Sequence, residues 1–64
     1  MESDRAQLSA MASTLDEVTR RVTEIAARYQ GSTREDVGQS LYDTERALAR
    51  ASRQLAKTMR LMRG

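Results

Sequence analysis

The chain has 64 residues, 39% of them apolar and 31% charged, and its formal net charge is only +2. It contains no Cys and no His, which excludes disulfide bonds and nearly all zinc, iron and copper sites. A chain this short buries only about 60% of the surface that its unfolded form exposes and is marginally stable alone. We therefore expect a single domain over residues 1–64 that gains stability by associating with another chain.

The composition also bears on the compartment. No stretch of the sequence approaches the roughly 20 apolar residues of a membrane-spanning helix. The first four residues lack the basic start and apolar run of a secretory signal, so we expect a cytoplasmic protein. Ten of the eleven basic residues are Arg, which is compatible with a GC-rich bacterial genome.

The first half of the chain has the apolar periodicity of a helix. Its large apolar residues alternate in spacing between three and four, as the a and d positions of a heptad repeat do. We predict a helix over residues 3–30, with Ser3 as its N-cap and ion pairs between Asp16 and Arg20, Glu17 and Arg21, and Glu24 and Arg28. The predicted association seam of this helix, with Leu8 at position a, consists of Leu8, Met11, Leu15, Val18, Val22, Ile25 and Tyr29.

A break is expected where helix-ending and helix-starting signals coincide. Gly31 can adopt the left-handed conformation that ends many helices. Ser32 with Glu35 fits a capping box, in which each side chain bonds the backbone amide of the other, and Thr33 with Asp36 is an overlapping alternative. So short a connection predicts an antiparallel hairpin. One continuous helix is the competing interpretation. In such a helix, the apolar stripe of the second half of the chain would be five residues out of phase with that of the first half.

The second half predicts a helix over residues 33–62. Its seam repeats every seven residues and consists of Leu41, Leu48, Leu55 and Met62. Small or branched residues (Val37, Thr44, Ala51 and Thr58) alternate with these, a pattern that lets two helices approach closely. Gly38 in the first turn either permits close packing or leaves the start of the helix frayed.

An all-α, antiparallel two-helix hairpin has only one shared interface and leaves apolar surface uncovered. Two hairpins packed face to face would bury both seams in a four-helix bundle or coiled-coil assembly. Two-fold symmetry is the commonest arrangement of soluble oligomers, so we expect a homodimer. Assembly with a different helical protein is the alternative.

Residues that could perform catalysis are not arranged to do so. The adjacent acidic pairs, at residues 16–17 and 35–36, diverge by about 100° on a helix and do not converge on a substrate. The glycines do not form a phosphate-binding loop. We therefore predict a protein that is not an enzyme and that has no catalytic, cofactor-binding or metal-binding residues.

The basic residues of the second helix form a stripe of their own. Their spacing of 4, 3, 4 and 3 places them at the outward c and f positions of the heptad. The stripe is either a solvated face or a binding ridge for an anion such as nucleic acid, an acidic protein or an anionic membrane. We expect foremost a non-enzymatic protein–protein interaction or regulatory module, and as the alternative a small nucleic-acid-binding protein. The candidate anion- or partner-binding ridge, called the basic ridge below, consists of Arg46, Arg50, Arg53, Lys57 and Arg60.

Overall fold

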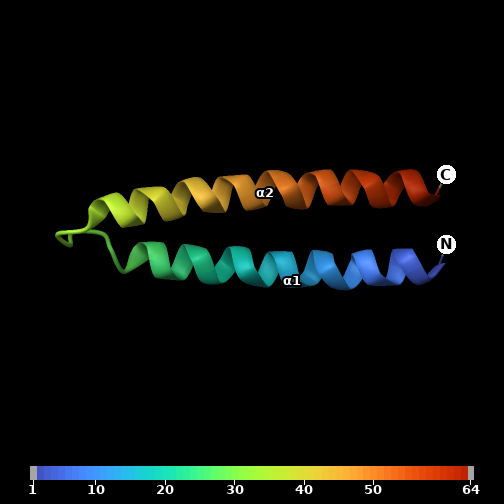
Figure 1. Cartoon of the computed structure of the whole chain (residues 1–64), viewed down its shortest axis with the longest axis horizontal. Coiled ribbons are helices and arrows are strands. Elements are labelled where there is room, and N and C mark those ends of the chain that lie inside the picture. The colour runs from blue at the N-terminus through green and yellow to red at the C-terminus, as the bar shows by residue number, and fades with distance from the viewer. Residues whose placement is uncertain (1, 64) are drawn as a thin grey trace.

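The protein is an antiparallel pair of helices (Figure 1). The computed structural model describes residues 2–63, in which α1 spans Glu2–Ala27 and α2 spans Glu35–Arg63. The two helices pack against each other along their length, with the turn at one end and both chain ends at the other. The predicted all-α hairpin is thereby confirmed, and the single continuous helix is excluded.

The end of α1 differs from the sequence prediction by three residues. The amides of residues 28–30 donate to carbonyl oxygens three residues back, at 3.0 to 3.3 Å, and not four residues back as in an α-helix. This tighter winding leads into Gly31, which has φ of +75°. The α-helix therefore ends at Ala27, and the predicted last turn is a series of tight turns that finishes at the glycine.

Replacing Gly31 by alanine is expected to lower the free energy of unfolding by about 1–2 kcal/mol. A Cβ at this position would meet no atom within 4 Å, so the loss would come from the left-handed backbone alone. Gly31→Asn should cost less, because asparagine tolerates this conformation better than alanine. Urea unfolding of the two variants measures the difference. Equal stabilities for the two variants would contradict this explanation.

The turn is held by two side chains that accept backbone amide hydrogens, but not in the predicted capping box. The Ser32 hydroxyl accepts from the amide of Arg34 at 3.1 Å and donates to the carbonyl of Tyr29 at 2.7 Å. The Glu35 carboxylate accepts from the amide of Gly31 at 3.0 Å. The reciprocal box was wrong because the Ser32 amide already donates to the Tyr29 carbonyl, which leaves the Gly31 amide for Glu35.

Two other predicted caps are also wrong. The helix already includes Glu2, so Ser3 lies inside the first turn and is not its N-cap. The Asp36 carboxylate bonds the guanidinium of Arg34 at 3.0 Å in place of the Thr33 amide. This hydrogen bond from Arg34 lowers the pKa of the Asp36 carboxyl.

The closest approach of the helices lies next to the turn. Ala26 has no exposed surface and is the only fully buried apolar residue within residues 2–63. Gly38 lies against it: a Cβ built there would be 3.1 Å from the Cβ of Tyr29 and 3.4 Å from the carbonyl oxygen of Ala26. Since α2 is a continuous helix through this position, Gly38 serves close packing and does not mark a frayed start.

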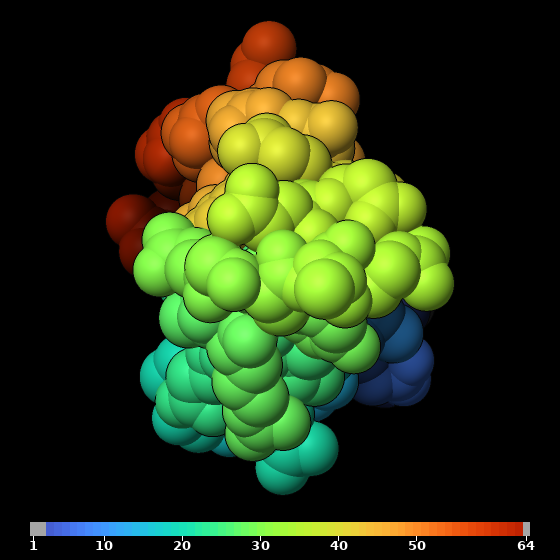
Figure 2. All heavy atoms as spheres, turned by 90° about the vertical axis from the view of Figure 1, so that its left-hand side faces the viewer, coloured from blue at the N-terminus to red at the C-terminus, as the bar shows by residue number. Residues whose placement is uncertain are grey.

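The hairpin is elongated and only two helices thick. Viewed from the turn end, the turn lies across the front of the two stacked helices (Figure 2). The Cα radius of gyration is 15.0 Å, whereas a compact domain of this length has about 11 Å. The accessible surface is 4964 Å², against about 4,100 Å² for a typical monomer of this mass. A single hairpin therefore leaves much more surface exposed than a globular protein of the same size.

Candidate interaction surfaces

The contact face of α1 consists of its a and e positions. With Leu8 at a, the residues at a are large and apolar, and those at e are small. All are at least half-buried against α2: Leu8, Leu15 and Val22 at a, and Ala12, Thr19 and Ala26 at e. The small e residues let the α2 backbone come close, as it does at Gly38.

The d positions of the predicted seam lie outside this contact. Met11 is 55% exposed, and Val18 and Ile25 are each 40% exposed. The seven residues predicted as one seam thus divide into two sets. The a set packs within the hairpin, and the d set forms a separate row of large apolar side chains in solvent.

Two hydrogen bonds to side chains of α2, one from α1 and one from the turn, mark one side of the hairpin as polar. Ser52 donates to the Asp16 carboxylate at 3.1 Å, and Gln30 donates to the Tyr42 hydroxyl at 3.3 Å. Successive residues of a helix are turned by about 100°, so a residue two positions after Asp16 projects roughly 160° away from it. Val18 therefore lies on the opposite side of the hairpin, and the other two d residues align with it at intervals of seven.

The leucines of α2 lie on that same opposite side. Leu48 and Leu55 flank Ser52, four residues before it and three after, so they lie about 40–60° round the helix from the contact line. These leucines and Tyr42 lie on opposite sides of the contact line. We call the side that results the apolar face, and it consists of Met11, Val18, Ile25, Leu41, Leu48, Leu55 and Met62. The leucines are half-buried, and Met62 is 36% exposed.

The basic ridge lies on the outer surface of α2. The line of α2 that contacts α1 runs through its e positions, among them Gly38 and Ser52, and the c and f positions face away from it. All five ridge side chains are exposed. Four of them line a shallow depression that also includes Ala47 and Ala51. Among the side chains of residues 3–63, Arg46 pairs with Asp43, and no carboxylate pairs with the other four: Arg50, Arg53, Lys57 and Arg60.

Two cations of α1, Arg20 and Arg21, differ from those of the ridge because they pair with acidic neighbours on the same helix. Arg20 forms ion pairs with Glu17 and, at 3.1 Å, with Glu24, and Arg21 lies 4.0 Å from Glu17. The hydrogen bond and positive charge of Arg20 lower the pKa of the Glu17 carboxyl. The same pair raises the pKa of Arg20. These carboxylates are therefore engaged on α1 and do not reach the basic ridge.

Only one of the three predicted ion pairs is present as predicted, that of Glu17 with Arg21. Asp16 does not bind Arg20, because its carboxylate faces α2 and accepts from Ser52. Glu24 pairs with Arg20 instead of Arg28. Both differences arise because helix spacing permits several partners at three and four residues, and the second helix removes Asp16 from that competition.

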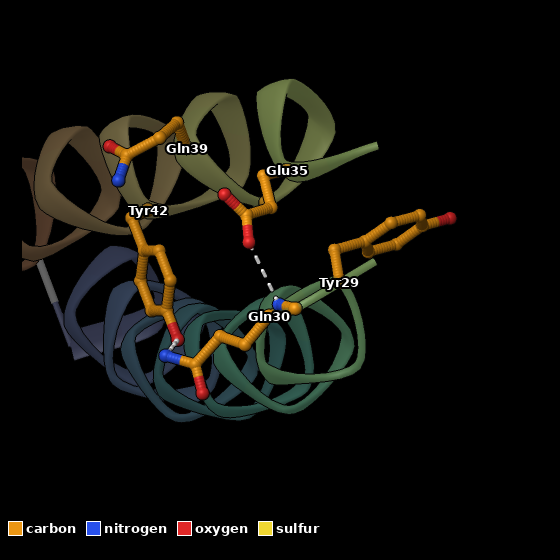
Figure 3. Close-up of a pocket in the computed structure, with 7 residues that line it drawn as sticks. Tyr29, Gln30, Glu35, Gln39 and Tyr42 are labelled. Atoms are coloured by element: carbon orange, nitrogen blue, oxygen red, sulfur yellow. Dashed lines mark hydrogen bonds between the residues drawn. The ribbon is translucent and has the colours of Figure 1, made fainter. Parts of the chain in front are cut away.

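A pocket that the sequence did not indicate lies at the turn (Figure 3). It holds about 200 Å³, below the usual range of ligand sites. Four of its polar groups already bond each other: Glu35 with the amide of Gly31, and Gln30 with Tyr42. The ring of Tyr29 points away from these groups. The pocket therefore offers little for recognising a small molecule.

The side chains of residues 3–63 include no cluster of three or more acidic groups that could hold a metal ion. Neither helix, within the same range, is long and apolar enough to cross a membrane. No family model, curated protein or solved structure matches the chain.

Proposed function

We propose that this protein is a non-enzymatic interaction module whose apolar face is covered by a second copy of the chain in a four-helix bundle. The observation that supports this proposal is the row formed by Met11, Val18 and Ile25, which is exposed beside the α2 leucines. A continuous apolar patch rimmed by polar residues is typical of an interface. The dimer would serve as a scaffold that presents its polar outer faces to another macromolecule.

The surface area supports a second copy as the occupant. The hairpin exposes about 800 Å² more than a typical monomer of its mass, which is close to the area each partner contributes to a standard interface. No residue of the apolar face is charged, so the faces of two copies can meet without electrostatic repulsion. A small ligand would leave most of a face this long uncovered.

The spacing of the d row suits two-fold symmetry. Met11 and Ile25 each lie seven residues from Val18, so an antiparallel α1–α1 contact about a two-fold axis at Val18 puts Met11 opposite Ile25 of the partner subunit. Along α2, the leucines at 48 and 55 would exchange places about the same axis. Such self-complementarity is what an isologous interface requires.

Sedimentation equilibrium over a range of concentrations tests the proposed dimer. We expect twice the mass of the chain at roughly micromolar concentration and a melting temperature that rises with concentration. A monomer that melts cooperatively at roughly tens of micromolar would contradict self-association. If such a monomer became more stable only when a different helical protein was added, that protein would replace the second copy as the occupant.

A further inference from the structure

Although the net charge is close to neutral, acidic and basic residues are strongly segregated along the chain. Residues 47–63 contain five basic side chains and no acidic one, whereas the rest of the chain has six basic against nine acidic. Three acidic side chains of α1 are engaged: Glu17 and Glu24 pair with Arg20, and Asp16 accepts a hydrogen bond from Ser52. The positive charge of α2 is therefore left exposed on its outer surface.

We propose that the basic ridge binds the phosphate backbone of nucleic acid, without reading the base sequence. Arg50, Arg53, Lys57 and Arg60 are exposed and have no ion-pair partner among the side chains of residues 3–63. Guanidinium groups bind phosphate through two parallel hydrogen bonds, which makes arginine well suited to this ligand. The ligand class is thus a chain of phosphodiester groups.

The shape of the ridge suits a regular, extended polyanion. Residues 46–60 span about 21 Å of helix axis, with a cation roughly every 5 Å. The c and f rows lie about 60° apart, so the cations form one narrow, straight band. Because the hairpin is only two helices thick, α2 is a convex edge that can approach a strand or groove without obstruction.

Two features of this surface argue against other uses. Leu61, 72% exposed, is the only large apolar residue on the outer side of α2, and the chain has no Phe or Trp, so the surface lacks the apolar groups that insert into a membrane. Tyr42 is half-buried and bonded to Gln30 on the polar side, so it offers no platform for stacking bases. The remaining mode of binding is contact with the nucleic-acid backbone, without recognition of the bases.

The proposal is independent of the proposed dimer, because the ridge lies away from the apolar face. A dimer would carry two ridges and bind a long strand more tightly through avidity. Mass measurement tests the dimer and does not test the ridge, so each proposal can fail without the other.

Fluorescence anisotropy with the full chain and a short duplex of random DNA sequence is the test. With roughly four phosphate contacts, raising the salt from about 50 to about 200 mM should weaken binding by about 100-fold. Two duplexes of unrelated sequence should bind equally. Absence of binding at low salt, or binding that salt does not weaken, would overturn the proposal.

Matched triple variants locate the contact. The combination of Arg50→Gln, Arg53→Gln and Lys57→Gln should weaken binding by about 100-fold or more and lower the salt slope by about three. As the control, Arg20, Arg21 and Arg28 are each replaced by Gln, which removes the same charge from α1 and the turn that follows it. The control should retain most of the affinity. Equal losses in both triples would overturn the assignment to the ridge.

Further measurements distinguish loss of binding from loss of folding, and nucleic acid from other anionic partners. Circular dichroism establishes that each variant is helical, and the single variant Arg53→Gln, with an expected loss of about 10-fold, serves if the triple unfolds. Polyglutamate and vesicles that contain phosphatidylserine are tested at the same salt. Tighter binding to either of these than to DNA would overturn nucleic acid as the partner.

Discussion

Val18→Glu is expected to weaken self-association by about 100-fold or more, which corresponds to about 3 kcal/mol. Val18 is 40% exposed in the single hairpin, so a glutamate there remains hydrated and costs the monomer little. In the proposed dimer, two such carboxylates would meet near the two-fold axis in an apolar interface. Burial of unpaired charge is strongly unfavourable, and two like charges add to the cost.

Ser13→Glu is the matched control for this variant. Ser13 is exposed at an f position of α1, away from both α2 and the apolar face, and its replacement introduces the same charge. We expect the control to keep the mass of the parent protein and the dependence of its melting temperature on concentration. If Val18→Glu and Ser13→Glu had the same mass at every concentration, the apolar face would not be the site of self-association.

Ala26→Leu is expected to lower the free energy of unfolding by about 1–3 kcal/mol, because it overpacks the closest contact between the helices. Ala26 has no exposed surface, and the position opposite is Gly38, whose absent side chain is what permits the approach. Three additional carbon atoms would have to separate the helices next to the turn. Their separation would also disturb the bond between Gln30 and Tyr42.

The neighbouring substitution Ala27→Leu provides the comparison. Ala27 is exposed and lies at the end of the same helix, so the same side chain there should change stability by no more than about 0.5 kcal/mol. Urea unfolding at one fixed protein concentration measures both variants, since the stability of a dimer depends on concentration. Equal losses in the two variants would show that helix propensity, and not close packing, determines the effect.

Much of the hairpin could be predicted because its signals are local. The spacing of apolar residues in each half reflects helix geometry, and Gly31 can adopt the left-handed conformation that the turn requires. The outward position of the basic ridge followed from the same periodicity. The details of the turn could not be predicted, because Ser32 and Glu35 each had several backbone amides within reach.

The heptad pattern established which residues share a stripe, but it left open how each helix is rotated about its own axis. That rotation depends on which side chains allow the two backbones to come closest. Ala26 and Gly38 are small enough for close contact, and so α1 turns its a and e positions inward and leaves Val18 outside. Likewise, the charges on α2 are evident in the sequence, whereas the lack of an ion-pair partner for four of the five ridge cations within residues 3–63 depends on the tertiary structure, in which Asp16 faces Ser52. Helix content, the turn and the charge pattern thus follow from the sequence alone, because they depend on neighbours along the chain. The apolar face and the unpaired ridge depend on packing between residues far apart in the chain, and only the tertiary structure decides them.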